Sequence, residues 1–139
     1  MANTQLWRER IGVPQVLLVD DNPLQLNIRE TVLRNAGFLV SVATTVASAM
    51  ATLRVLGDGL GVVVTDHVMP GQSGSDFVRE LRQENQWVPV IVLSGMAEAE
   101  SEYEGLDVLF RQKPIPPPEL IALVSASLED NGHDQAGAA

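Results

Sequence analysis

The stretch that decides the fold is GVVVTDHVMPGQSG, residues 61–74. Three valines and a threonine lead directly into Asp66, and Pro70, Gly71 and Gly74 follow soon after. A continuous run of β-branched residues is typical of a strand buried on both faces, and prolines and glycines indicate a turn. The pattern therefore predicts that Asp66 stands at the end of a buried strand.

The same alternation of strand and helix continues on both sides of this stretch. Short apolar runs predict strands at 16–19, 38–43, 62–65, 88–94 and 107–110. The loop GDGLG, residues 57–61, precedes the third run. Apolar residues at helical spacing predict helices between and after the strands. These helices are marked by Leu24, Ile28 and Val32; by Val46, Met50 and Leu53; by Phe77, Val78 and Leu81; by a short segment at 96–104; and by Leu120, Ile121, Val124 and Leu128.

Capping residues support the first two helices. Asn22 and Pro23 are an N-cap and a first-turn proline, Gly37 is suited to end that helix, and Thr45 is an N-cap for the next one. Five β–α units in one chain predict a parallel sheet with helices on both faces. In such a sheet, ligands and chemistry gather at the carboxyl ends of the strands.

Composition narrows the classes of function. The 139 residues suffice for one domain, and with 45% hydrophobic but only 4% aromatic residues the core must be aliphatic. The net charge of −9 disfavours nucleic acid and anionic lipid as partners, and favours cations or basic protein surfaces. The absence of cysteine excludes disulfides and thiolate chemistry. No stretch has the pattern of a signal peptide or the length of a membrane span, so we expect a soluble, cytoplasmic protein.

Polar residues follow four of the predicted strands. Asp20 and Asp21 come after the first strand, Asp66 after the third, Ser94 after the fourth and Lys113 after the fifth. Three neighbouring carboxylates repel one another, and a divalent cation relieves that repulsion. Mg²⁺ prefers oxygen ligands and often binds carboxylate and phosphate oxygens together. With an ammonium and a hydroxyl beside it, such a site suits phosphoryl transfer, with Asp66 best placed to act as nucleophile.

Four segments then resemble one known family. VLLVDDNPLQL, VVVTDHVMPGQSG, VIVLSG and LFRQKPI are similar to the receiver domain of two-component response regulators, the CheY-like superfamily. The resemblance covers nearly the whole chain. It implies a flavodoxin-like, doubly wound sheet of five parallel strands in the order 2-1-3-4-5, with five helices. The nineteen positions from Ser94 to Lys113 imply that helix four is short or irregular.

The resemblance also implies roles for individual residues. Asp66 would be the phosphoacceptor. Asp21, Asp66 and the backbone carbonyl of Val68 would ligate Mg²⁺, and Asp20 would contribute through a bound water. Ser94 and Lys113 would contact the phosphoryl oxygens.

A second group of implied roles concerns the response to phosphorylation. Ser94 and Phe110 would act as switch residues, although Phe110 could equally be a core residue, and without a hydroxyl it could switch only by packing. The bond between Lys113 and Pro114 would be a cis peptide. The surface of helix four, strand five and helix five would change shape and bind a downstream protein.

Further expectations concern organisation and partners. We expect an N-terminal extension at 1–13, a receiver domain at 14–129 and a disordered tail at 130–139. The phosphoryl donor would be a histidine kinase or a histidine phosphotransfer protein, with no nucleic-acid or membrane partner.

Two other interpretations are disfavoured by particular residues. A phosphatase-like hydrolase with an Asp nucleophile typically carries a second Asp two positions later, where this chain has Val68, so enzymatic turnover is disfavoured. A receiver-like interaction module that is never phosphorylated has no need of all five polar residues. His67 is interpreted as a loop residue at the rim of the site.

Overall fold

The computed structural model describes the backbone of residues 13–138 and the side chains of residues 13–129. Five parallel strands form one sheet in the order β2-β1-β3-β4-β5. The strands are β1 (Gln15–Val19), β2 (Leu39–Ala43), β3 (Leu60–Asp66), β4 (Val90–Ser94) and β5 (Leu109–Gln112). The helices are α2 (Pro23–Asn35), α3 (Val46–Leu56), the 3₁₀ turn η1 (Gly57–Gly59), α4 (Gly74–Glu84), the 3₁₀ helix η2 (Ala97–Tyr103) and α5 (Pro117–Ala138).

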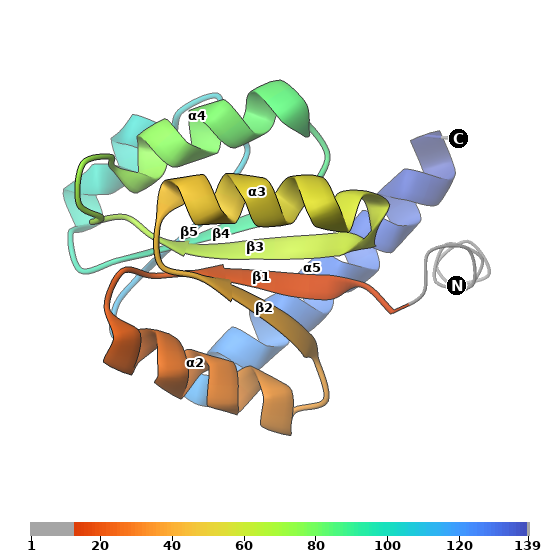
Figure 1. Cartoon of the computed structure of the whole chain (residues 1–139), viewed down its shortest axis with the longest axis horizontal. Helices are drawn as coiled ribbons and strands as arrows, with labels where there is room; N and C mark the ends of the chain where they lie inside the picture. Colours follow the sequence, from red (N-terminus) through yellow and green to blue (C-terminus); the bar gives the residue numbers. More distant parts are fainter. Residues whose placement is uncertain (1–12, 139) are drawn as a thin grey trace.

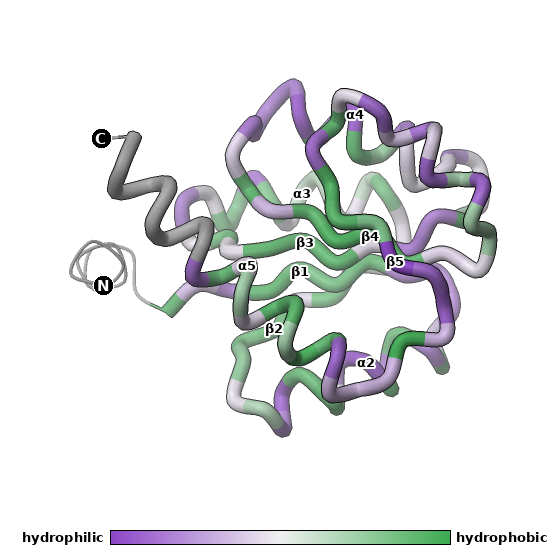
Figure 2. Tube along the Cα trace, turned by 180° about the vertical axis from the view of Figure 1, so that it is seen from behind, coloured by the Kyte–Doolittle hydropathy of each residue, from purple (hydrophilic) through white to green (hydrophobic). Residues whose placement is uncertain are grey.

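The sheet separates two helical layers (Figure 1). Helices α3 and α4 cover one face, and α2 and α5 cover the other. Strands β1, β3 and β4 are hydrophobic along most of their length (Figure 2), because side chains on both of their faces are buried. The predicted flavodoxin-like fold and strand order are confirmed.

The caps expected from the sequence are present. The Asn22 side chain accepts hydrogen bonds from the N–H groups of Leu24 and Gln25, and Thr45 accepts one from Ser48. Gly37, just beyond α2, has a φ of +99°, a conformation that suits glycine. The predicted helix four is confirmed as a short element, since η2 has seven residues and is a 3₁₀ helix.

The residues that mark α2 by their spacing do not form its buried face. Leu24 and Ile28 are 71% and 55% exposed. The helix instead buries Leu26 and Leu33, which lie two turns apart against the sheet. Both rows are apolar at helical spacing, so the periodicity predicted the helix and left its orientation undecided.

The start of β5 also differs from the prediction, which placed it at 107–110. Asp107 has a positive φ of 57°, so it belongs to a turn and not to a strand. The Arg82 guanidinium donates to the carbonyls of Leu106 and Asp107 and holds this turn against α4. In addition, the expected loop at 57–61 contains η1, and Leu60 and Gly61 already belong to β3.

The domain boundaries stay a prediction. The proposed extension at 1–13 falls almost entirely outside the described residues. The proposed tail at 130–139 falls where α5 is described by its backbone alone, up to Ala138.

Candidate functional site

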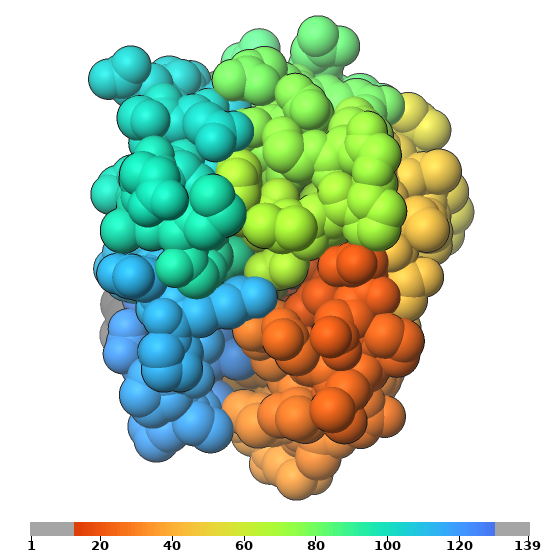
Figure 3. Space-filling view, turned by 90° about the vertical axis from the view of Figure 1, so that its left-hand side faces the viewer, coloured from red at the N-terminus to blue at the C-terminus, as the bar shows by residue number. Residues whose placement is uncertain are grey.

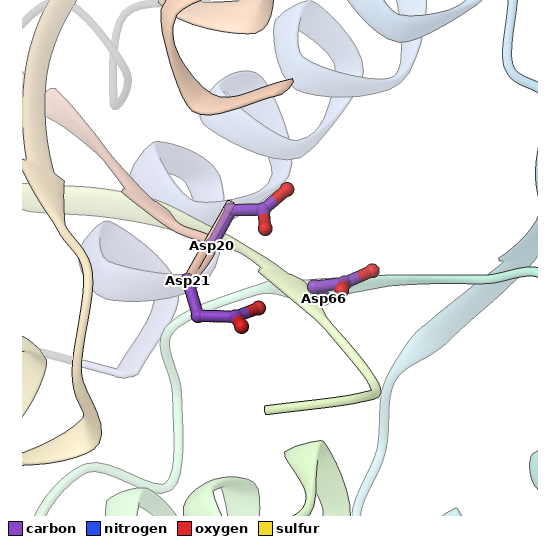
Figure 4. Close-up of side chains that lie close together, drawn as sticks. All are labelled: Asp20, Asp21 and Asp66. Carbon is purple, nitrogen blue, oxygen red and sulfur yellow. The ribbon is translucent and has the colours of Figure 1, made fainter. Parts of the chain in front are cut away.

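Three aspartates meet at the carboxyl edge of the sheet. Asp20 and Asp21 follow β1, and Asp66 is the last residue of β3. One carboxylate oxygen from each residue lies within 4.8 Å of the others. Figure 4 shows the three side chains pointing to the same side of the strand ends. Because β1 and β3 are neighbours in the sheet, their ends bring together residues that are more than forty positions apart.

The loops that surround this edge form one face of the molecule. Figure 3 looks onto this face, where the segments after β1, β3, β4 and β5 meet. Asp20 is fully buried, Asp66 is nearly so, and Asp21 is partly exposed. The site is therefore open to solvent mainly on the side of Asp21.

Lys113 reaches this site from the loop after β5. Its ammonium forms an ion pair with Asp66 Oδ1 and donates a hydrogen bond to Gln25 Oε1 at 3.3 Å. The peptide bond between Lys113 and Pro114 is cis, as the resemblance implied. The predicted proximity of Lys113 to Asp66 is present in the structure.

Arg29 is a second cation at the site, and the sequence analysis did not single it out. Its guanidinium Nη1 lies 2.6 Å from Asp20 Oδ2. Burial, as the largest cause, raises the pKa of the Asp20 carboxyl, and the neighbouring Asp66 raises it further. The N–H of Asn22 and the charge of Arg29 oppose this rise in pKa without cancelling it. We call Asp20, Gln25, Arg29 and Lys113 the charged flank of the site.

Ser94 lies at the end of β4, and its side chain does not point freely into the site. It is buried, its Oγ accepts a hydrogen bond from Met96 N at 2.9 Å, and it also donates to Met96 O at 3.3 Å. Its carbonyl accepts a hydrogen bond from Lys113 N, so Ser94 and Lys113 are adjacent through the backbone. Val68 is 60% exposed in the loop after β3.

The other side of the site is aromatic. His67 Nδ1 is 2.6 Å from the Tyr103 hydroxyl, and the two rings pack edge to face with centroids 5.5 Å apart. The centroids of the Tyr103 and Phe110 rings are 5.8 Å apart. Burial, and then the charge of Glu102, raise the pKa of the Tyr103 hydroxyl above its ordinary range. We call His67, Tyr103 and Phe110 the aromatic flank.

His67 was expected to be a loop residue at the rim of the site; it does lie just after the end of β3, but its expected position at the rim is wrong because it is buried. The residue is 5% exposed, and its backbone N–H continues the pairing of β3 with β4 by donating to Leu93 O. Its imidazole lies near Glu102, with Nε2 3.6 Å from a carboxylate oxygen. The side chain thus belongs to the contact between β3 and η2.

Gly74, the first residue of α4, lies very close to the end of β3 and to η2 because it has no side chain. A Cβ at this position would lie 2.5 Å from the Tyr103 hydroxyl, 2.7 Å from Asp66 O and 2.9 Å from His67 Cα. The Gly74 N–H also donates to His67 O at 2.6 Å. The glycine that ends the opening motif therefore lets α4 begin directly against the strand that carries Asp66.

Sequence reasoning missed Arg29 and Tyr103 for different reasons. Gln25 and Arg29 are one helical turn apart, just after the aspartate pair, so they share one face of α2, but the sequence does not tell whether that face is turned toward the site. Tyr103 is separated from His67 by 36 positions. Because no alternation or spacing links the two residues, the sequence alone offered no signal for that contact.

The donor set fits a hard divalent cation. Clustered carboxylate oxygens are the ligands that Mg²⁺ prefers, and the partly exposed Asp21 leaves room for water in the coordination shell. The ammonium of Lys113 beside Asp66 is suited to contact an anion bound at that carboxylate. Chemically, the arrangement can stabilise negative charge that is placed on or next to Asp66.

A doubly wound sheet with an acidic cluster and a lysine at its carboxyl edge is the arrangement expected of a receiver domain of the CheY-like superfamily. The family model of the response regulator receiver domain matches residues 16–125, and the chain belongs to this family.

A curated relative supports the assignment. The DNA-binding response regulator MtrA of Mycolicibacterium smegmatis is 32% identical over 125 residues, which cover 88% of this chain and 54% of MtrA. The chain spans about half or less of the length of the first curated relatives that it matches. The similarity therefore concerns the receiver part of those longer proteins.

Solved structures agree with the fold. A response regulator receiver protein from Sinorhizobium medicae WSM419 matches with a TM-score of 0.74 and 30% identity, covering 86% of this chain and 97% of that one. A CheY-like receiver domain protein from Methanospirillum hungatei JF-1 matches with a TM-score of 0.80 and 18% identity, covering 88% and 98%. The second likeness, at this low identity, shows the fold alone. Among the described residues, no helix is both long and apolar enough to cross a membrane.

Proposed function

We propose that Asp66 accepts a phosphoryl group from a phosphohistidine donor in a Mg²⁺-dependent reaction. The donor would be a histidine kinase or a histidine phosphotransfer protein in the cytoplasm. The observation that carries the proposal is the meeting of Asp20, Asp21 and Asp66 within 4.8 Å, with the Lys113 ammonium on Asp66, in a chain of the receiver family.

The transfer step follows from the chemistry of these groups. A carboxylate oxygen of Asp66 attacks phosphorus, the bond between phosphorus and the donor imidazole nitrogen breaks, and the imidazole leaves with that electron pair. Lys113 contacts a phosphoryl oxygen, which its pairing with Asp66 already favours. Ser94 would contact another oxygen after its hydroxyl leaves the backbone of Met96.

The proposed metal site uses Asp21, Asp66 and the Val68 carbonyl, with Asp20 acting through water. When bound, Mg²⁺ neutralises part of the charge that develops on the phosphoryl oxygens. The chain's own residues orient the acceptor. Asp66 is fixed by its place at the end of the central strand, and its carboxylate is held by Lys113.

The proposed output is a change in the surface formed by η2, β5 and α5, to which an unidentified downstream protein binds. A cavity of about 300 Å³ lies between η2 and β5, lined in part by Tyr103, Val108 and Phe110. It offers space for Phe110 to change its packing. Such a change is a shift between conformations that the new charge at Asp66 favours.

The experiment is intact-mass spectrometry after incubation with acetyl phosphate or phosphoramidate, with and without Mg²⁺. We expect the wild type to gain one phosphoryl group only with Mg²⁺, and Asp66→Asn to gain none. Asp58→Asn is the matched control, because Asp58 lies in η1 at the amino end of β3, opposite the carboxyl end that carries Asp66, and it should be phosphorylated like the wild type.

A failure of the wild type to gain mass with small donors would call for the same assay with phosphorylated histidine kinases. If these also transfer nothing, the proposal is wrong. The chain would then be a receiver-like interaction module that works without phosphorylation.

A further inference from the structure

Arg29 is a largely buried arginine on α2 that pairs with an aspartate of the site. It projects from the second turn of α2, its side chain is 14% exposed, and its Nη1 lies 2.6 Å from Asp20 Oδ2. A second guanidinium nitrogen, Nη2, is 3.5 Å from Gln25 Oε1. The guanidinium is therefore held in the charged flank and is not a mobile surface group.

The Asp20 carboxylate is already satisfied by the protein. Its Oδ1 accepts a hydrogen bond from Asn22 N at 2.9 Å, and its Oδ2 is paired with Arg29. The side chain is only 1% exposed, so water contributes little to its solvation. Because buried charges need partners, Arg29 makes an ionised Asp20 tolerable inside the site.

The charges at the site are nearly balanced without a metal. Lys113 is paired with Asp66 and Arg29 with Asp20. Asp21 alone of the three carboxylates has no ion-pair partner within the described part of the chain. Three carboxylates with two cations leave one uncompensated negative charge, whereas Lys113 alone would leave two.

A fixed positive charge beside the carboxylates opposes the binding of a second cation. An arginine does not lose its proton in a protein, so its charge persists at every working pH. A divalent ion bound between the aspartates would lie within a few ångströms of the group that Arg29 already neutralises. At that range, unit charges in a partly buried site still repel one another appreciably.

We propose that Arg29 is an internal counter-cation that weakens Mg²⁺ binding at the aspartate cluster and takes over part of the metal's role in balancing its charge. The inference rests on the proposed function, because it concerns the same metal site. Arg29 is a positioning residue that acts through Asp20. As a consequence, the site requires a higher Mg²⁺ concentration to fill than it would with an uncharged residue at this position.

The test is a calorimetric titration of the full chain with Mg²⁺, in mildly alkaline buffer, which favours the ionised form of the carboxylates. Arg29→Met removes the charge and keeps a long side chain, and Arg29→Lys keeps the charge. We expect Arg29→Met to bind Mg²⁺ on the order of tenfold more tightly than the wild type. Arg29→Lys should remain close to the wild type.

Arg79→Met is the matched control, because Arg79 is an exposed arginine on α4 that pairs with Asp76 away from the cluster. It should leave the Mg²⁺ affinity unchanged. Urea unfolding of each variant establishes that it is folded, and Arg29→Gln replaces Arg29→Met if the latter is not.

Three outcomes separate this inference from the proposed function. Unchanged or weaker Mg²⁺ binding by a folded Arg29→Met overturns the role of Arg29 and leaves the metal site standing. Equal tightening by Arg29→Lys overturns the charge explanation. The absence of Mg²⁺ binding in the wild type and in every variant overturns both the inference and the proposed metal site.

Discussion

The two flanks of the aspartate cluster are built on opposite principles. The charged flank joins α2 to the loop after β5 through ion pairs and hydrogen bonds, as Arg29 with Asp20 and Lys113 with Asp66 illustrate. The aromatic flank joins β3 to η2 and β5 through ring packing and one buried hydrogen bond. Ion pairs therefore balance the charge on one side of Asp66, whereas close ring packing fixes the positions of the side chains on the other.

The largest expected effect comes from a substitution that disrupts the packing of the aromatic flank against the start of α4. Gly74→Ala would place a Cβ against the Tyr103 hydroxyl and against the backbone of Asp66 and His67, which cannot yield as a flexible side chain would. We expect the free energy of unfolding to fall by about 2 kcal/mol, as for other cases of overpacking. Urea denaturation measures the change.

Gly59→Ala is the control for this substitution, because no atom lies within 4 Å of a Cβ built at Gly59. It should leave stability nearly unchanged. Equal stability of Gly74→Ala and the wild type would mean that the start of α4 and η2 are both free to move away from the end of β3, and that the aromatic flank is loosely packed.

A smaller effect tests the hydrogen bond within the aromatic flank. Tyr103→Phe keeps the ring and removes the hydroxyl, which leaves the buried His67 Nδ1 without its partner. We expect a loss of about 1 to 2 kcal/mol in the free energy of unfolding, the usual result when a buried polar group loses its partner. The measurement is again a urea transition.

The exposed Ser101, whose hydroxyl donates to Glu98 O, provides the comparison. Ser101→Ala should change stability far less than Tyr103→Phe. Similar values for the two variants would place the His67 side chain in contact with water and contradict its description as buried.

The smallest effect concerns the charged flank and depends on pH. The pKa of Asp20 is raised in the folded protein, mainly by burial, so the folded state binds its proton more firmly than the unfolded chain does. The contribution of this group to stability is therefore complete below its unfolded pKa of about 4, and it is lost as pH rises through the folded pKa. Without Mg²⁺, the stability of the wild type relative to Asp20→Asn should fall over this range.

Saturating Mg²⁺ should remove this fall in relative stability, because a bound cation favours the ionised carboxylate. Urea midpoints measured across the acidic range, with and without Mg²⁺, provide the data. A relative stability that rises with pH in the absence of Mg²⁺ would mean that Arg29 and Asn22 outweigh burial at Asp20.

The fold was predictable because its signals are local. The valines before Asp66, the cap at Asn22 and the apolar runs at the other strands each specify structure within a few residues. The meeting of the three aspartates could be predicted because parallel strands that neighbour one another end at a common edge of the sheet. The orientation of α2 could not be decided, since the row of Leu24 and Ile28 and the row of Leu26 and Leu33 are equally apolar.

The contacts of Arg29 and Tyr103 within the two flanks were the part of the site that sequence reasoning could not supply. The pairing of Arg29 with Asp20 depends on how α2 rotates against the sheet, which the sequence left open. The contact between His67 and Tyr103 depends on the missing side chain at Gly74 and on the path of η2. Both are tertiary features, in which distance along the chain carries no information.

Tyr103 has one further consequence, because it is the only tyrosine in the chain. The tyrosine part of the near-ultraviolet absorbance, which overlaps that of two tryptophans, arises from a single phenol whose hydroxyl is hydrogen-bonded to His67, the residue next to Asp66. Any event at the cluster that lengthens or breaks this bond would shift that absorbance without a label or an engineered fluorophore. The difference in absorbance between the wild type and Tyr103→Phe thus reports on this one contact beside the cluster.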